Sequence, residues 1–421
     1  MKTLKNDLSE EAWLEQKAQL AARRLLKKKG LDCTVAHFLA SVQEGDIKII
    51  QLFINAGMDV SATECDGGAT ALMCAAFTGP FSTIHPKGCQ GGNTALMWAA
   101  SNGYTEIVKT LLIYGAKINA KNNHGETALM AAAAFKCKDC CPTALMYPVS
   151  NGHTEIIKIL LTHGAEINAK KNNGETALML AVASGPETLE TVKILLDYKA
   201  EVNAKDHQGT TALMKASRYS GVKIVQLLLD HGAEVNAKCS ENETALMEAS
   251  GVADSIETVQ TLLAYGAEVN AATHDGYTAL MIASLRWQLE NVQALLAQGA
   301  EVNVKDNFGG TALIYAAMYD GNTEIVKLLL AHGAKIEAKD HEEKTALIHA
   351  AWSNDNQETV KVLLAHGARI DATDHKGNTA LNVAWKHRQT KIIRILRKHM
   401  DKNSKILPTA DFLKIQNEHT G

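Results

Sequence analysis

Three cysteines with the spacing C-x-x-C-C, Cys137, Cys140 and Cys141, are the residues of this 421-residue chain that most readily suggest chemistry. Thiolates at this spacing can bind zinc when two further ligands come from elsewhere, and the nearest candidates are His85 and Cys89. Because no second C-x-x-C is present, the simpler interpretation is that small cysteines end an imperfect helix. A metal or redox sensor at this cluster is the alternative function.

Of the sixteen histidines, at least seven fall at two recurring positions rather than in clusters. One position is the last turn of an expected helix, where a histidine meets the negative end of the helix dipole, and the other is the tip of a turn. The helix-end histidines are His163, His231, His332 and His366, and the turn-tip histidines are His207, His341 and His375. This recurrence favours a structural role over acid–base or metal chemistry.

Other signals of function are mostly negative. The sequence has no phosphate-binding glycine loop, H-E-x-x-H, nucleophile elbow or kinase-type motif set, so we expect a non-enzyme without cofactors. The balance of 43 basic against 46 acidic residues provides no global positive field to hold nucleic acid. No apolar run of about 18 residues and no N-terminal signal pattern occurs, which predicts no membrane span and a cytoplasmic protein with reduced cysteines.

The elements that position these residues are set by a recurring tripeptide, Thr-Ala-Leu. From Thr176 onward the successive steps are 35, 33, 34, 33, 34 and 34 residues. The threonines of the tripeptide are Thr70, Thr94, Thr127, Thr143, Thr176, Thr211, Thr244, Thr278, Thr311, Thr345 and Thr379. A fixed period in this range predicts a stacked array in which each unit buries its apolar face against its neighbours.

One unit, residues 94–123, shows how the sequence specifies a helical hairpin. The segment 96–100 forms the apolar side of a short helix, and the apolar residues between 107 and 112 form the stripe of a second helix. Thr94 occupies the N-cap position of the first helix, and Gly115 supplies the left-handed residue that ends the second. We therefore expect the threonine hydroxyl to accept a hydrogen bond from a free helix N–H.

These residues resemble the ankyrin repeat family. The stretch 206–238, with "DHQGTTALMKAS" followed by "IVQLLLDHGAEVNAK", reproduces most of the family's pattern, and the resemblance covers about residues 34–400. It implies an all-α ankyrin-repeat solenoid with turn or β-hairpin-like fingers and a non-catalytic role in protein–protein interaction. The family's Pro after Thr is Ala here, and its His is Met, Ile or Asn. Lys199 and Trp287 replace turn glycines, so we expect their two units to deviate locally.

Three segments follow from the repeats. Residues 1–33 are expected to form an N-terminal capping helix, 34–400 a solenoid of about eleven units, and 401–421 a C-terminal tail. The array is expected to be irregular at 77–93, where two Pro and four Gly precede the next repeat, and at 131–148, where a first helix is partly duplicated.

The aromatic side chains provide the candidate binding site. Many of them fall on first helices, at helix exits or at turn tips, and stacking places corresponding positions side by side in one concave strip. The predicted partner-binding residues are Tyr219, Tyr277, Trp287, Phe308, Tyr315, Tyr319 and Trp352, with Arg218, Arg286 and His349 beside them. Large rings on rigid elements suit a protein partner, so we expect a monomeric scaffold that binds a protein and not nucleic acid.

Overall fold

The computed structural model describes residues 10–61, 92–134, 151–318 and 323–403. These residues form 21 α-helices and two short 3-10 helices, and their strand-like features are isolated bridge residues, which include the pairs Ala272–Thr278 and Thr373–Thr379. The chain divides into two compact units, Met1–Glu234 and Val235–Gly421, which are described separately. The segments expected to be irregular lie almost entirely outside the described residues.

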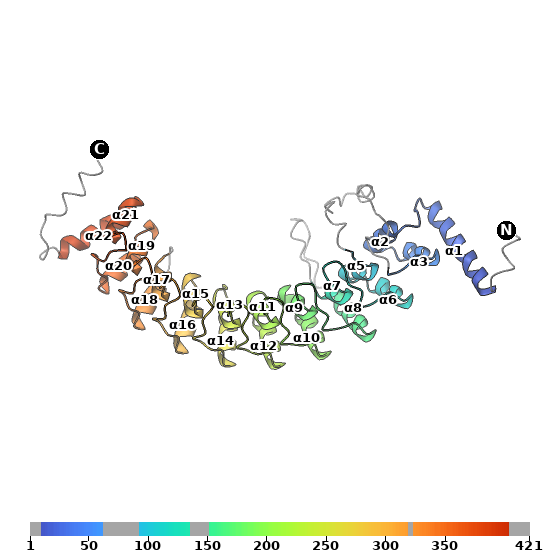
Figure 1. Cartoon of the computed structure of the whole chain (residues 1–421), viewed down its shortest axis with the longest axis horizontal. Coiled ribbons are helices and arrows are strands. Elements are labelled where there is room, and N and C mark those ends of the chain that lie inside the picture. The colour runs from blue at the N-terminus through green and yellow to red at the C-terminus, as the bar shows by residue number, and fades with distance from the viewer. Residues whose placement is uncertain (1–9, 62–91, 135–150, 319–322, 404–421) are drawn as a thin grey trace. The chain divides into compact units, whose positions relative to one another are not determined.

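The first unit begins with a long helix that packs against the third one. Beyond it, first and second helices of the repeats form two rows (Figure 1). Its helices are α1 (Glu10–Lys28), α2 (Val35–Glu44), α3 (Ile47–Asn55), α5 (Ala95–Ser101), α6 (Thr105–Ile113), α7 (Ala128–Ala133), α8 (Asn151–Thr162), α9 (Ala177–Ala183), η2 (Pro186–Thr188), α10 (Leu189–Asp197), α11 (Ala212–Tyr219) and α12 (Val222–Asp230).

The second unit has the same two-row arrangement, with odd-numbered first helices in one row and even-numbered second helices in the other (Figure 1). Its helices are α13 (Ala245–Ser250), α14 (Ile256–Ala264), α15 (Ala279–Leu285), α16 (Leu289–Ala297), α17 (Ala312–Met318), α18 (Thr323–Ala331), α19 (Ala346–Ala350), η3 (Asn354–Asn356), α20 (Gln357–Ala365), α21 (Ala380–Lys386) and α22 (Thr390–Asn403). The predicted all-α repeat solenoid is confirmed.

The repeated threonine caps the first helix of each described repeat. In nine repeats its hydroxyl accepts a hydrogen bond from the backbone N–H three residues later, at 3.3 or 3.4 Å. Eight of the nine threonines are buried, Thr379 being partly exposed, and the Ala and, in eight repeats, the Leu that follow them are buried too. The short first helix is therefore defined by its cap and by its packing between neighbouring repeats.

The two turns that lack glycine keep the geometry of the others. Lys199 and Trp287 adopt φ angles of 68° and 65°, close to the 80° and 83° of Gly115 and Gly232 at helix ends. The expected local deviation of these units is therefore wrong for the backbone. Packing of the helices on both sides fixes the turn, so a side chain occupies a left-handed conformation that costs about 1 kcal/mol.

Replacing Lys199 with glycine should consequently stabilise the first unit by up to about 1 kcal/mol, because glycine adopts φ near 70° without steric strain. Thermal unfolding of the full chain, followed by circular dichroism, measures this effect. The matched control is Gly232→Ala, since a Cβ at Gly232 meets no atom within 4 Å and tests backbone strain alone. That variant should melt at a lower temperature, and a Lys199→Gly variant that also melts lower would contradict the interpretation.

Candidate partner-binding surface

Two turns of the second unit are built on an aspartate that uses both carboxylate oxygens. Asp306 Oδ1 accepts hydrogen bonds from the backbone N–H groups of Phe308 and Gly310, both at 2.8 Å. Asp340 Oδ1 makes the same pair of bonds one repeat later, to residues 342 and 344 at 2.9 Å. The second oxygen of each aspartate is then directed at the first helix, nine residues further along the chain.

In the earlier of these repeats, the aspartate holds a tyrosine. The Tyr315 hydroxyl donates to Asp306, and its oxygen lies 3.3 Å from the hydroxyl oxygen of Tyr277. Tyr277 contacts both Tyr315 and Phe308, with ring centroids 5.6 and 6.4 Å apart. Gly310 permits this packing, because a Cβ there would lie 2.6 Å from the Tyr315 hydroxyl. Burial and the bond to Asp306 raise the pKa of Tyr315, so the phenol stays neutral.

In the next repeat, the aspartate holds a histidine. His349 Nε2 lies 2.7 Å from Asp340 Oδ2, and both side chains are largely buried. Burial alone would raise the pKa of Asp340. Hydrogen bonds from His349 and from the backbone N–H of Lys344 outweigh burial, so the pKa of this carboxyl is lowered. The arrangement is an ordered carboxylate–imidazole pair.

Four large aromatic side chains of the second unit are more than half exposed: Trp287, Phe308, Trp352 and, near its end, Trp385. Phe308 lies at a turn tip, Trp287 and Trp352 at the exits of α15 and α19. Each occupies an ordered turn or helix end, and the Phe308 ring leans on Tyr277. The geometry therefore combines buried polar pairs, which fix the turns, with rings that remain available for contact.

Similarity to known proteins agrees with this architecture. A family model described as ankyrin repeats (3 copies) matches residues 83–142, 136–206, 187–273, 246–340 and 338–406, which together make up most of the chain. The chain belongs to the ankyrin repeat family. Ankyrin repeats are generally protein–protein interaction modules, and the family is typically non-catalytic.

One relative of low sequence identity is also described as an ankyrin repeat protein. Over 135 residues the ankyrin chain is 25% identical to an ankyrin repeat-containing protein of Treponema pallidum (strain Nichols). The alignment covers 30% of this chain and 45% of the relative, so the chain spans less than half of that protein's length.

The predicted site residues of this ankyrin chain are distributed over both units. Arg218 and Tyr219 belong to the first unit, where the guanidinium lies 5.5 Å from the exposed tyrosine ring. The other predicted residues belong to the second unit, where Tyr277, Phe308 and Tyr315 form one cluster. The exposure expected for Tyr219 and Trp352 is confirmed, whereas Tyr319 lies outside the described residues.

Two predicted residues have more specific roles than the sequence indicated. Tyr315 is only 7% exposed, and its hydroxyl donates a hydrogen bond to Asp306. Its side chain therefore supports the turn and is not exposed for contact with a partner. His349 is likewise held by Asp340. Arg286 is exposed and ends α15 beside Trp287.

Aromatic contacts at the end of the second unit were missed. The Trp352 ring stacks on His387, with centroids 3.7 Å apart, and the Arg397 guanidinium lies 4.9 Å from the Trp385 ring. The spacing of 35 residues between Trp352 and His387 is one repeat period, so the sequence contained the signal for the first pair. Trp385 is more than half exposed despite its cationic neighbour.

In the first unit, Lys215 lies four residues after the repeated threonine, as Tyr315 does in the second, and it belongs to a group of ion pairs. Lys215 lies 2.9 Å from Glu175 and 3.4 Å from Asp206, and Lys171 lies 3.1 Å from Glu126. Burial alone would lower the pKa of Lys215. The hydrogen bond to Glu175 and the negative charge of Glu175 outweigh burial, so the pKa of Lys215 is raised. These ion pairs satisfy one another, so this group stabilises the first unit rather than presenting free charge.

The structure does not test the cysteine cluster. Cys137, Cys140 and Cys141 lie outside the described residues. Within the described part of the chain, Cys33 and Cys239 are free thiols and no group of three or more His, Cys, Asp or Glu side chains is arranged to hold a metal. No helix in these same ranges has both the length and the apolar composition to cross a bilayer.

The Asp340–His349 pair predicts an acid-dependent contribution to stability. Because the pKa of Asp340 is lowered on folding, its ionisation stabilises the fold above the unfolded value of about 3.9, and this contribution disappears as pH falls through the folded pKa. Asp340→Asn should therefore destabilise the chain by about 1 to 2 kcal/mol at pH 7 and by progressively less below pH 4.

Urea denaturation at a series of pH values checks this prediction. Asp371→Asn is the control, since Asp371 forms an exposed pair with Arg369 at 3.0 Å and its loss should cost little at any pH. A deficit of Asp340→Asn that is the same at pH 7 and pH 3 would show that charge plays no part in the pair.

Proposed function

We propose that this chain is a non-catalytic scaffold whose second unit binds a partner protein on the surface formed by its turns and first helices. The observation that carries the proposal is the exposure of Trp287, Phe308 and Trp352 on ordered elements. An exposed ring of this size is a source of binding energy, because covering its exposed half removes roughly 100 Å² of apolar area from water while few rotatable bonds lose their freedom.

The chemistry around the rings favours a protein partner over a small molecule. Phe308 lies at an open turn tip, and its neighbours include the buried Asp306–Tyr315 pair. The Asp340–His349 pair and the Arg286 guanidinium add polar groups near the helix exits. Separated aromatic anchors with polar groups between them are typical of protein interfaces, whereas small-molecule sites are enclosed.

The finer parts of the proposal follow from the same surface. The partner would lie on the concave side of the second unit and contact Tyr277, Phe308, Trp352 and His349, with Tyr319 contributing from the same repeats. Tyr219 and Arg218 would add a contact on the first unit. We further propose that the protein is a cytoplasmic monomer, is not an enzyme and does not use nucleic acid as its partner.

Replacing Phe308 and Trp352 together with alanine tests this assignment. Both side chains are more than half exposed, so helix content and melting temperature should stay nearly unchanged. Capture of the partner from an extract of the source organism, quantified by mass spectrometry, should fall by about tenfold or more, because interface anchors of this type each contribute 1 kcal/mol or more.

The matched control is Tyr198→Ala with Tyr265→Ala. These tyrosines are also exposed, but they follow the ends of second helices, away from the proposed surface. Capture should be unaffected in this control. Equal capture by both folded variants would place the interface elsewhere, and unfolding of the Phe308 and Trp352 variant would show that these rings are packing residues.

A further inference from the structure

The last two helices carry a charge opposite to that of the repeats before them. Residues 380–403 contain seven Lys and Arg and a single Asp, whereas residues 235–379 contain ten basic and twenty acidic residues. The second unit therefore has a strongly basic end next to an acidic body. A separation of this kind directs negatively charged partners to the end of the unit.

Four basic residues of α22 have no acidic partners among the described residues, whereas most basic residues of 235–379 do. Within the described residues, no ion pair joins Lys391, Arg394, Arg397 or Lys398 to a carboxylate. Six basic side chains of the preceding repeats do form such pairs: Lys238–Glu268, Lys327–Glu324, Lys339–Glu343, Lys344–Glu342, Lys361–Glu358 and Arg369–Asp371. The positive charge of α22 is therefore not neutralised within the described chain.

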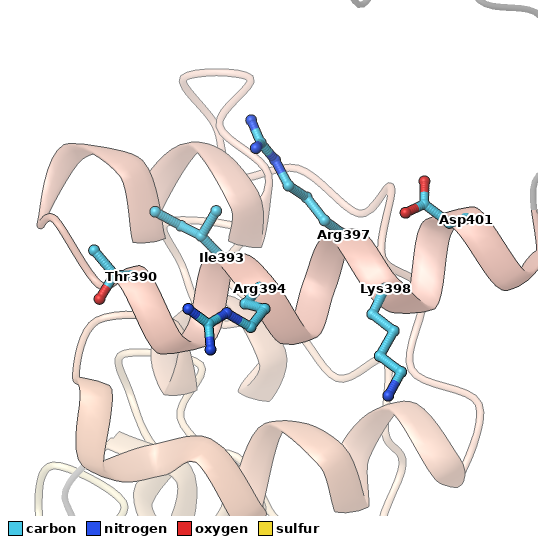
Figure 2. A pocket seen from close by; sticks show the side chains of 6 residues that line it. All are labelled: Thr390, Ile393, Arg394, Arg397, Lys398 and Asp401. Carbon is cyan, nitrogen blue, oxygen red and sulfur yellow. The ribbon is translucent and has the colours of Figure 1, made fainter.

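The packing of α22 determines which side chains face outward. Ile392 and Leu396 are fully buried, and the helix packs against α20 and α21. The opposite side presents an open hollow of about 390 Å³, lined by Thr390, Ile393, Arg394, Arg397, Lys398 and Asp401 (Figure 2). Three cations thus surround one hollow on a helix that is anchored by its apolar face.

Arg397 is the most constrained of these cations. Its guanidinium lies 4.9 Å from the exposed ring of Trp385, an arrangement in which the ring orients the planar cation. Its Nε atom is buried and makes no hydrogen bond within the described residues. A side chain held in place before binding loses less entropy when a carboxylate pairs with it.

We propose that the basic face of α22, defined by Arg394, Arg397 and Lys398 together with Trp385, binds an acidic segment of a partner polypeptide. Carboxylates of the segment pair with the three cations, and an apolar or aromatic side chain of the segment covers the Trp385 ring. Asp401, at the edge of the hollow, limits the length of the anionic stretch that the face accepts.

The charge distribution favours a short peptide over nucleic acid. A polyanion that continued past α21 and α22 would meet the acidic excess of the preceding repeats, and phosphate contacts dominate the affinity of nucleic-acid binding. The other basic cluster of the chain, at the end of α1, differs in kind. Lys27 and Lys28 lie in the last turn of α1, where the helix dipole already complements their charge.

A defined probe tests the proposal on the full chain: a fluorescein-labelled peptide of eight glutamates with one central phenylalanine, followed by fluorescence anisotropy in low salt. The wild-type chain should bind the probe. Arg394→Gln combined with Lys398→Gln should weaken binding about fivefold or more, because two charge pairs are lost. Lys27→Gln combined with Lys28→Gln removes the same charge and should change the affinity less than about twofold.

Three results would overturn the proposal. They are absence of probe binding to the wild-type chain, equal weakening by the two charge-matched variants, and displacement of the probe by a nine-nucleotide oligouridylate at lower concentration than by unlabelled peptide. The Phe308→Ala variant should bind the probe as the wild type does. This surface can therefore fail or succeed independently of the proposed aromatic interface.

Discussion

An asparagine side chain that bonds twice to the backbone of the next repeat is the interaction on which the surfaces of this protein depend. In the second unit, Asn303 Nδ2 donates to the carbonyl of Gly333 at 2.9 Å, and its Oδ1 accepts from the N–H of Lys335 at 2.7 Å. The same pair of bonds recurs at Asn119, Asn203, Asn236 and Asn270. Backbone hydrogen bonds also join successive turn tips, for example from the N–H of His341 to the carbonyl of Phe308 at 2.8 Å. Successive repeats within a unit are thereby held in one register.

This register lets the same scaffold carry different chemistry in the two units. In three repeats the residue four positions after the repeated threonine faces the turn aspartate, so its identity decides which pair forms there. Lys215 joins an ion-pair network, Tyr315 a tyrosine–aspartate pair and His349 a histidine–aspartate pair. Where these pairs are satisfied internally, specificity must come from the exposed rings and from the unpaired cations of α22.

The fold was predictable because its determinants are local and repeated. The 33 to 35 residue period, the capping threonines and the left-handed glycines each act within one repeat, and the structure confirms the helices they specify. The candidate site was predictable only in part. Burial of Tyr315 depends on the free oxygen of Asp306 and on the missing side chain of Gly310, and neither follows from periodicity. At Lys199 and Trp287 the sequence predicted a local deviation that the backbone does not show. Tertiary packing imposes on both residues a left-handed conformation that their residue types disfavour.

Site-specific photo-crosslinking tests the central claim most directly. With p-benzoylphenylalanine in place of Phe308 or Trp352 in the full chain, irradiation in an extract of the source organism should join the chain to the same polypeptide from both positions. The same group in place of Tyr265, which is exposed at the end of a second helix, should give no such product. Crosslinks to that polypeptide from position 265 alone, or crosslinks to nucleic acid from positions 308 and 352, would contradict the account.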